Sequence, residues 1–331
     1  MNNNWLTKPR SRREMMDSLI KAGGVAAGGA ALAACAPEAP SEPAARREPI
    51  DFNDPVQSMR SFIKLIGDLD PTVETPSWFA GTLYADVRRD RPLKPLMGVE
   101  GFGVLRTERK SDTSYHVFNR ELAFYTDLKT GEYLDTWVNP FTKEECEVKS
   151  IHNMTVNAHM IVSEKVGTAI EMDFDGNLME VPLPLKWINI GDKLFSDFAV
   201  HTMFPNELKP AEWPRESSGP VVRIAEIFQR VADLAELENP DVTSADYSGT
   251  WTRVGPWLPW MRQGQADGNL VFSTFMTKLK SADELPARFK ARIEERLPEY
   301  FIAPPPETWG SKNDSSFSVY ARENEPLPPK E

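Results

Sequence analysis

The sequence predicts a mainly β fold of the α+β class, with an antiparallel barrel or sandwich as its body and two flanking helices. Two observations support this prediction. From Asp51 to about Met203, short runs in which apolar and polar residues alternate follow one another, with turn residues between them. Helical spacing of apolar residues occurs instead at two places in the second half of the chain.

The expected strands are joined by segments with turn chemistry. In the first half they cover residues 78–84, 97–105, 115–125, 133–138 and 148–162. Residues 126–131 (TDLKTG) should connect two antiparallel strands, and Asp175-Gly176 should form a hairpin turn. Asp267-Gly268 marks a further hairpin before a strand at 270–275. Short turns favour antiparallel neighbours, and a lipocalin-like barrel is one arrangement that provides them.

The two expected helices cover 221–237 and 281–297. The first has five apolar residues at helical spacing: Ile224, Ile227, Phe228, Val231 and Leu234. In the second, Leu285, Phe289 and Ile293 form the apolar stripe. Between residues 51 and 203 we expect no long helix.

The N-terminus has the features of an export signal followed by a lipid attachment site. Arg12 and Arg13 resemble the pair of the twin-arginine signal. The weakly apolar run 22–34 would form a helix of roughly 20 Å, shorter than a hydrocarbon core of about 30 Å. It ends in LAAC at 32–35, which resembles the lipobox of bacterial lipoproteins, so we expect cleavage before Cys35 and acylation of Cys35. The alternative is a secretory signal that is cleaved with release of the chain.

These signals divide the chain into four parts. They are a twin-arginine and lipoprotein signal at 1–34, a lipidated, Pro/Ala-rich tether at 35–50, a single β-rich domain at 51–322 and a flexible tail at 323–331. Removal of 1–34 takes away five basic and two acidic residues, so the net charge changes from −11 to −14. Such a chain is a poor partner for nucleic acid. We expect it on the periplasmic side of a bacterial membrane, held by the lipid on Cys35, with the outer membrane favoured.

Several longer stretches resemble a bacterial family known as domain of unknown function 1838, whose members often carry twin-arginine signals. They are FIKLIGDLD at 62–70, LMGVEGFGVLR at 96–106, YTDLKTGEYLDTWVNPFTKE at 125–144, IHNMTVN at 151–157 and WTRVGPWLPWMRQG at 251–264. They span nearly all of the chain after the tether, so the resemblance implies one domain. None is a catalytic signature, and the resemblance implies no particular reaction.

The segment 251–264 is unusually rich in Trp, Pro and Met. Large aromatic and Met side chains line apolar pockets in which a few polar groups orient a ligand. Six residues are therefore candidates for a pocket lining: Trp251, Trp257, Trp260, Met261, Arg253 and Trp137. A rigid plug, with the Trp side chains in the core, is the competing interpretation. A contact patch for another protein is a third.

His152 is the candidate general acid or base. If 151–161 forms one strand, His152 and His159 point to opposite faces, because they are an odd number of residues apart. No metal site is therefore assigned to them. Glu100 and Glu121 lie in β-like runs. They are the carboxylates that would act with His152, or else structural ion-pair partners of arginines.

Three functions stay open from the sequence. The first is a periplasm-facing lipoprotein that binds a small, largely apolar molecule. The second is an enzyme that acts on such a molecule through acid/base chemistry at His152 and a carboxylate. The third is an accessory protein that docks on a membrane complex. The first two require a cavity of roughly several hundred Å³. The sequence names no cofactor and no oligomeric state.

Overall fold

The computed structural model describes residues 47–87, 91–174 and 177–329, and at 172–174 and 177–179 only the backbone. Arg12, Arg13, Cys35, most of the tether and the turn at 175–176 lie outside these ranges. The described residues form one compact unit.

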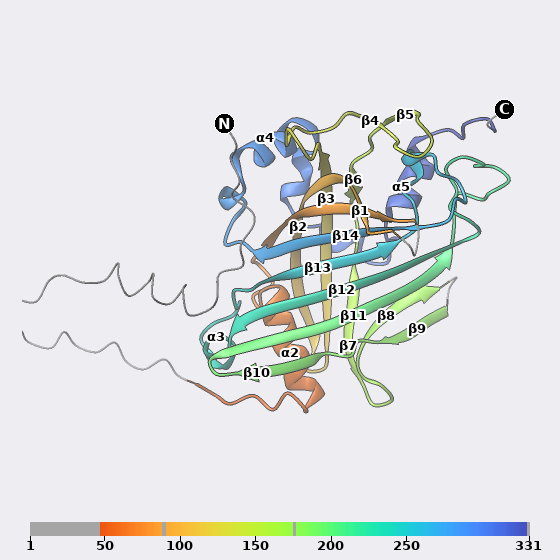
Figure 1. Cartoon of the computed structure of the whole chain (residues 1–331). Helices are drawn as coiled ribbons and strands as arrows, with labels where there is room; N and C mark the ends of the chain where they lie inside the picture. Colours follow the sequence, from red (N-terminus) through yellow and green to blue (C-terminus); the bar gives the residue numbers. More distant parts are fainter. Residues whose placement is uncertain (1–46, 88–90, 175–176, 330–331) are drawn as a thin grey trace, which may run out of the picture. The chain divides into compact units, whose positions relative to one another are not determined.

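The mainly β, antiparallel fold predicted from the sequence is confirmed. In the described ranges, twelve strands form one antiparallel sheet in the order β10-β11-β12-β13-β14-β1-β2-β3-β7-β8-β9, with β6 paired to β3 (Figure 1). The bounds are β1 (Thr75–Asp86), β2 (Lys94–Ser111), β3 (Ser114–Thr126), β6 (Ile151–Asn153), β7 (Ala158–Ser163), β8 (Gly167–Phe174) and β9 (Asn177–Pro182). They continue with β10 (Lys186–Ile190), β11 (Lys193–Pro205), β12 (Val221–Asp233), β13 (Ser248–Gly255) and β14 (Asn269–Lys278). A separate ribbon consists of β4 (Thr136–Val138) and β5 (Glu145–Glu147).

The sheet is open but strongly curled. Its end strands, β10 and β9, do not pair with each other in the described part of the chain, so the barrel alternative is not realised as a closed barrel. Phe198 on β11 nevertheless shares an apolar cluster with Tyr115 and Val117 on β3. These strands are six spacings apart in the sheet order, which is about 29 Å on a flat sheet. The sheet therefore curls, and we call the face that carries these three residues the inner face.

The helix predicted at 221–237 is wrong. These residues form β12 as far as Asp233, and only α3 (Leu234–Glu238) is helical. Ile224 and Phe228 fit a helical stripe, but they also belong to the even-numbered row that faces inward in the strand. Pairing with β11 on one side and β13 on the other decides for the strand, and β-branched residues favour it.

Three further helices pack on the sheet. α4 (Ala287–Arg296) corresponds to the second predicted helix and covers the outer face with Phe289 and Ile293. α2 (Pro55–Ile66) was not expected, although Asp54-Pro55 is a helix-start signal, with Asp54 accepting a hydrogen bond as N-cap. It packs Phe62 against Phe198 at the inner face. α5 (Ser316–Glu323) follows near the C-terminus and begins with a capping box.

The Trp-rich segment forms a plug of core residues beyond β13. Trp257, Trp260 and Met261 are at most 4% exposed, and the last two lie in a short 3-10 helix, Pro259–Met261. Trp260 packs against Tyr125 of β3 and against Trp137 of β4, with ring centroids 5.5 and 5.8 Å apart. The segment thus joins the sheet to the β4–β5 ribbon.

Candidate binding site on the inner face

Three aromatic side chains, which we call the aromatic track, follow the inner face from β12 to β1. Phe228 stacks on Trp251 with ring centroids 6.5 Å apart, and Trp251 meets Phe79 nearly edge-on at 4.9 Å. Gly101 on β2 makes room for Phe79, because a Cβ at residue 101 would collide with its ring. Phe228 and Phe79 are only half-buried, so part of this apolar surface is accessible.

Charged and polar groups lie on the same face. Glu121 of β3 accepts a hydrogen bond of 2.6 Å from Asn153 Nδ2. Burial raises the pKa of Glu121 and the carboxylate of Glu226 raises it further, whereas the bond from Asn153 and the charge of Arg253 lower it. Arg253 also opposes the effect of burial, which raises the pKa of Tyr125. Groups from β3, β12 and β13 therefore interact across the curled sheet.

Several polar atoms of the inner face have no hydrogen-bond partner in the described part of the chain. They are the hydroxyl oxygens of Tyr125 and Ser196, Oδ1 of Asn153, Nε1 of Trp251, and Nε and Nη1 of Arg230. Buried polar groups in folded proteins are nearly always hydrogen-bonded, and an unpaired one costs about 1–3 kcal/mol. Apolar walls with a few converging polar atoms are typical of small-molecule sites.

The six pocket candidates from the sequence fall into two groups. Trp251 and Arg253 lie on the inner face, whereas the remaining four belong to the plug and its neighbour β4. A pocket of about 20 Å³ lies between the plug and α5, and its lining includes Tyr125, Trp260 and His152. It has room for about one water molecule, far less than the several hundred Å³ expected of a ligand cavity.

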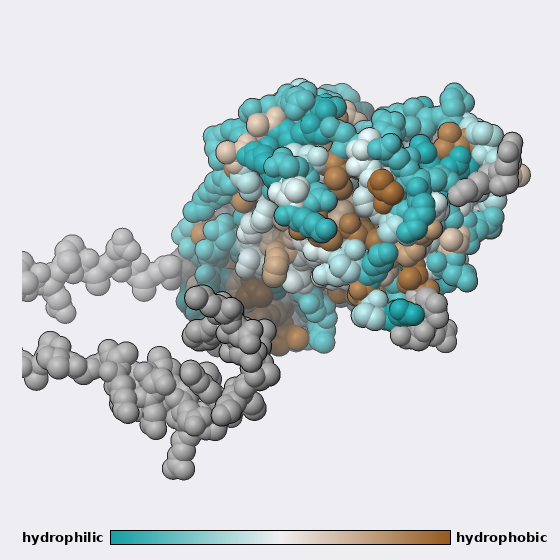
Figure 2. All heavy atoms as spheres, turned by 45° about the horizontal axis from the view of Figure 1, so that its top comes forward, coloured by the Kyte–Doolittle hydropathy of each residue, from teal (hydrophilic) through white to brown (hydrophobic). Residues whose placement is uncertain are grey.

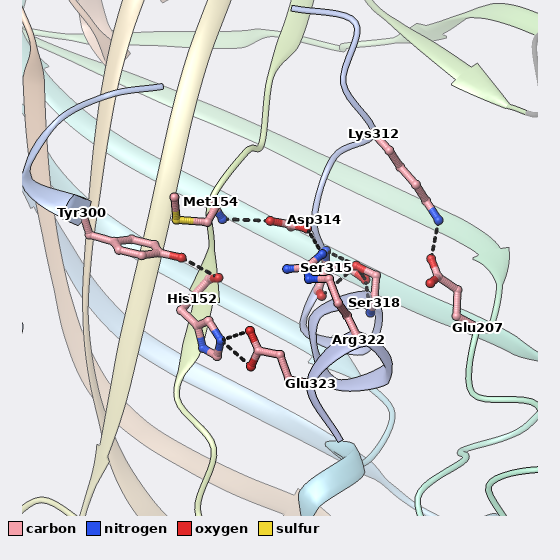
Figure 3. A network of polar contacts seen from close by, with 10 residues as sticks. All are labelled: His152, Met154, Glu207, Tyr300, Lys312, Asp314, Ser315, Ser318, Arg322 and Glu323. Atoms are coloured by element: carbon pink, nitrogen blue, oxygen red, sulfur yellow. Dashed lines mark hydrogen bonds and ion pairs between the residues drawn. The ribbon is translucent and has the colours of Figure 1, made fainter. Parts of the chain in front are cut away.

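His152 meets a carboxylate at the rim of this pocket. Its Nε2 lies 2.9 Å from Oε2 of Glu323, and its Nδ1 lies 3.0 Å from the carbonyl oxygen of Ser150. The hydroxyl of Tyr300 donates to the carbonyl oxygen of His152 at 2.6 Å (Figure 3). Glu323 is the last residue of α5, in a segment that the sequence assigned to the tail, and its local sequence gives no sign of this contact.

The two carboxylates proposed from the sequence lie elsewhere. Glu121 belongs to the inner face, whereas His152 pairs with the neighbouring Leu122 and therefore points to the outer face. Glu100 accepts a hydrogen bond of 2.8 Å from the hydroxyl of Tyr133 and lies 3.8 Å from the guanidinium of Arg288. Glu100 thus ties α4 to the sheet as a structural ion-pair partner.

The expectation that His152 and His159 point to opposite faces is wrong. The strand expected through 151–161 is interrupted, and β6 and β7 pair with β3 in registers that differ by one residue. His152 pairs with Leu122 and His159 with His116, and these two partners share a face of β3. In the ranges that the structure describes, no group of three or more His, Cys, Asp or Glu side chains is arranged to hold a metal ion.

Arg230 was not singled out from the sequence. As a helix, 221–237 would place Arg230 just outside the apolar stripe, where a charged side chain is ordinary. In a strand it stands out as a charged residue in the inward row with Phe228 and Ala232. Arg230 could therefore have been identified from the sequence if these residues had been assigned to a strand.

The face seen in Figure 2 offers a different environment. It is mostly hydrophilic, and its hydrophobic residues gather mainly in its middle. A depression of about 260 Å³ has charged walls that include the ion pairs Lys312–Glu207 and Arg322–Asp314. Because its walls are charged, this depression does not suit an apolar ligand. No described helix is both long and apolar enough to cross a membrane.

Fold and site define a protein with an open, curled antiparallel sheet whose inner face combines aromatic rings with unpartnered polar atoms. The family model described as "Protein of unknown function (DUF1838)" matches residues 73–324, so the chain belongs to that family. No curated protein matches the chain.

Two solved structures show only weak likeness to the chain. An OmpF of Salmonella typhi in complex with daunomycin is 7% identical, with a TM-score of 0.20 over 62% of this chain and 97% of its own. Immune modulator A of Aeromonas veronii is 11% identical, with a TM-score of 0.11 over 67% of this chain and all of its own. Such low scores carry no argument about fold or function.

Proposed function

We propose that this chain is an exported, lipid-anchored protein on the periplasmic side of a bacterial membrane, whose domain binds a small, largely apolar molecule at the inner face. The observation that carries the proposal is the half-buried aromatic track with unpartnered polar atoms beside it. The anchor on Cys35 rests on the sequence alone.

An amphipathic molecule satisfies both features of the inner face. Its apolar body would cover the exposed parts of Phe79 and Phe228, which contributes about 25 cal/mol per Å² of apolar surface removed from water. Its polar group would give partners to atoms such as Trp251 Nε1, at about 0.5–1.5 kcal/mol for each hydrogen bond. A purely polar ligand would gain little from the rings.

The tether fits a ligand that comes from the membrane. Residues 36–49 number fourteen and reach at most roughly 45–50 Å when extended. A lipid on Cys35 would therefore keep the domain close to a bilayer, where apolar molecules concentrate.

Native mass spectrometry of the protein purified from its own membrane, followed by organic extraction, tests the binding proposal. We expect one small apolar compound to accompany the wild-type protein and to be depleted in Phe79→Ala. Phe275→Ala is the matched control, because Phe275 is 74% exposed. A spectrum of the bare protein, or equal retention in Phe79→Ala, would overturn the proposal.

Substitution of Cys35 tests the anchor separately. Because the lipid would be attached to its sulfur, Cys35→Ala should move the protein from the membrane fraction to the soluble periplasmic fraction after osmotic release. Continued membrane attachment of exported Cys35→Ala, after a high-salt wash, would contradict lipid anchoring.

An enzyme is the second candidate, because His152 lies 2.9 Å from Glu323 beside a pocket. A membrane lipid extract incubated with the wild-type protein should then yield a product, detected by mass spectrometry, that His152→Ala does not form. An unchanged lipid profile with both proteins would exclude this candidate for those lipids. The docking alternative would place the contact with a membrane complex in the Trp-rich segment, where Trp257 and Trp260 are 3% and 4% exposed.

A further inference from the structure

Arg230 is a buried cation that has no carboxylate of the described residues within ion-pair distance. It is 6% exposed, and its guanidinium makes no ion pair or hydrogen bond with them, with Nε and Nη1 fully buried. Its contacts are with the rings of Phe198, Phe228 and Tyr247, whose centroids lie 5.2, 5.0 and 5.0 Å from the guanidinium carbon.

The cation–π contacts do not replace hydrogen bonds. Aromatic faces attract the positive charge of a guanidinium, but they leave N–H donors in its plane unpaired. A buried guanidinium therefore needs acceptors, and breaking a buried charge pair costs about 3–5 kcal/mol. In this protein the described residues supply no acceptor, so the acceptors are solvent or a bound molecule.

Ser196 provides a second unpartnered group at the same place. It is the cross-strand partner of Arg230 on β11, so both side chains point to the inner face, and its buried hydroxyl has no partner in the described ranges. Lys278, 8% exposed, is a second buried cation close enough to interact with Arg230, and the nearby carboxylates of Asp246, Asp68 and Glu236 raise its pKa against the lowering effect of burial. Its Nζ already donates to the carbonyl oxygens of Lys64 and Gly67 and to Ser244. The free donors are therefore those of Arg230 and Ser196.

We propose that Arg230 and Ser196 bind the carboxylate of an amphipathic ligand whose apolar body lies along the aromatic track. Two N–H groups of a guanidinium match the two oxygens of a carboxylate, and the serine hydroxyl supplies a third donor. Phe228 contacts both Arg230 and Trp251, so the charged site and the aromatic track are continuous. The inference rests on the proposed function and names its ligand class: a long-chain carboxylic acid.

Fluorescence titration with cis-parinaric acid and its methyl ester tests this assignment. We expect the acid to bind the delipidated wild-type protein about 10-fold or more tightly than the ester. Arg230→Met should weaken binding of the acid by a similar factor and leave the ester nearly unchanged. Arg223→Met is the matched control, because Arg223 is an exposed residue on the opposite face of β12.

The outcomes separate the two proposals. Equal binding of acid and ester, or no change of acid binding in Arg230→Met, would overturn the carboxylate site while leaving the apolar ligand in place. Failure of both probes to bind would overturn the proposed function. Displacement of the acid by lysophosphatidic acid at much lower concentration than by palmitate would overturn the carboxylate assignment in favour of a phosphate.

Thermal unfolding of the delipidated proteins distinguishes a ligand site from a structural role. If Arg230 binds an anionic ligand and is unpaired without it, Arg230→Met removes an uncompensated charge from the ligand-free protein and should keep or raise its Tm. A clear fall in Tm for Arg230→Met, with unchanged acid binding relative to the wild type, would show that the guanidinium serves the core instead.

Discussion

At the scale of one residue, Glu121 shows how an ionisable group on the inner face affects the stability of the fold. Glu121 as a whole residue is half-buried, and its carboxyl accepts one hydrogen bond from Asn153 and experiences the charge of Glu226 from across the sheet. Burial is the main reason why its pKa is raised above the ordinary value of 4.5. Folding therefore shifts this carboxyl towards its protonated form relative to the unfolded chain, and its ionisation costs stability.

Replacement of Glu121 by Gln gives a prediction with a defined sign. Because the folded-state pKa is raised, its stabilising contribution is complete below about pH 4.5 and is lost as the pH rises through the folded-state pKa. Glu121→Gln should therefore gain stability relative to the wild type between pH 4.5 and 8. Urea unfolding across this range measures the difference, with the exposed Glu132→Gln as control. A difference that does not change with pH would contradict the account.

At the scale of elements, the C-terminal segment fills the gap between β6 and β7. Met154 N donates to Oδ2 of Asp314 at 3.0 Å, and the N–H of Asp314 donates to the carbonyl oxygen of Thr155 at 2.8 Å. Asn313 accepts from the N–H of Asn157 and donates to its carbonyl oxygen. The segment 313–314 thus supplies hydrogen bonds where the strand is interrupted, and it leads directly into α5.

Loss of Asp314 should loosen α5. Asp314→Ala leaves the partly buried N–H of Met154 without its acceptor and removes the ion pair with Arg322. We therefore expect a loss of about 1–3 kcal/mol in the free energy of unfolding. Asp314→Asn keeps an acceptor and should lose less. Hydrogen exchange of α5 residues should rise in Asp314→Ala. Unchanged exchange there would show that the segment does not hold α5.

Elements differ in how far the sequence alone could specify them. Strand β3 was expected at 115–125 and occurs at Ser114–Thr126, because clear alternation and flanking turn residues agreed. Segment 221–237 carried both periodicities, and its neighbours in the sheet decided between them. The one-residue register change between β6 and β7 depends on pairing with β3, so it could not be read from residues 151–161.

Residues of the candidate site also differ in how far the sequence alone could identify them. Trp251 and Glu121 were found because of their residue types. Arg230, Ser196 and Glu323 were missed, because each matters only through a partner far away in the sequence or through the lack of one. A buried charge without a counter-ion is visible only after the fold is known.

At the scale of the whole molecule, the curl of the sheet creates the site. β3 and β12 are five spacings apart, about 24 Å on a flat sheet, yet Glu226 on β12 influences the pKa of Glu121 on β3. α2 packs on the inner face at β7 and β8, and the plug lies beyond β13. The sequence predicted antiparallel pairing, but the degree of closure depends on how these covering elements pack, which alternation does not encode.

The central claim is that the inner face binds an amphipathic molecule, and a crystal structure of the protein purified from its own membrane tests it most directly. We expect electron density along Phe79, Trp251 and Phe228 that ends in a polar group within hydrogen-bond distance of Arg230 and Ser196. Inward collapse of these rings, with Arg230 and Ser196 paired to protein groups or water and no ligand density, would contradict it.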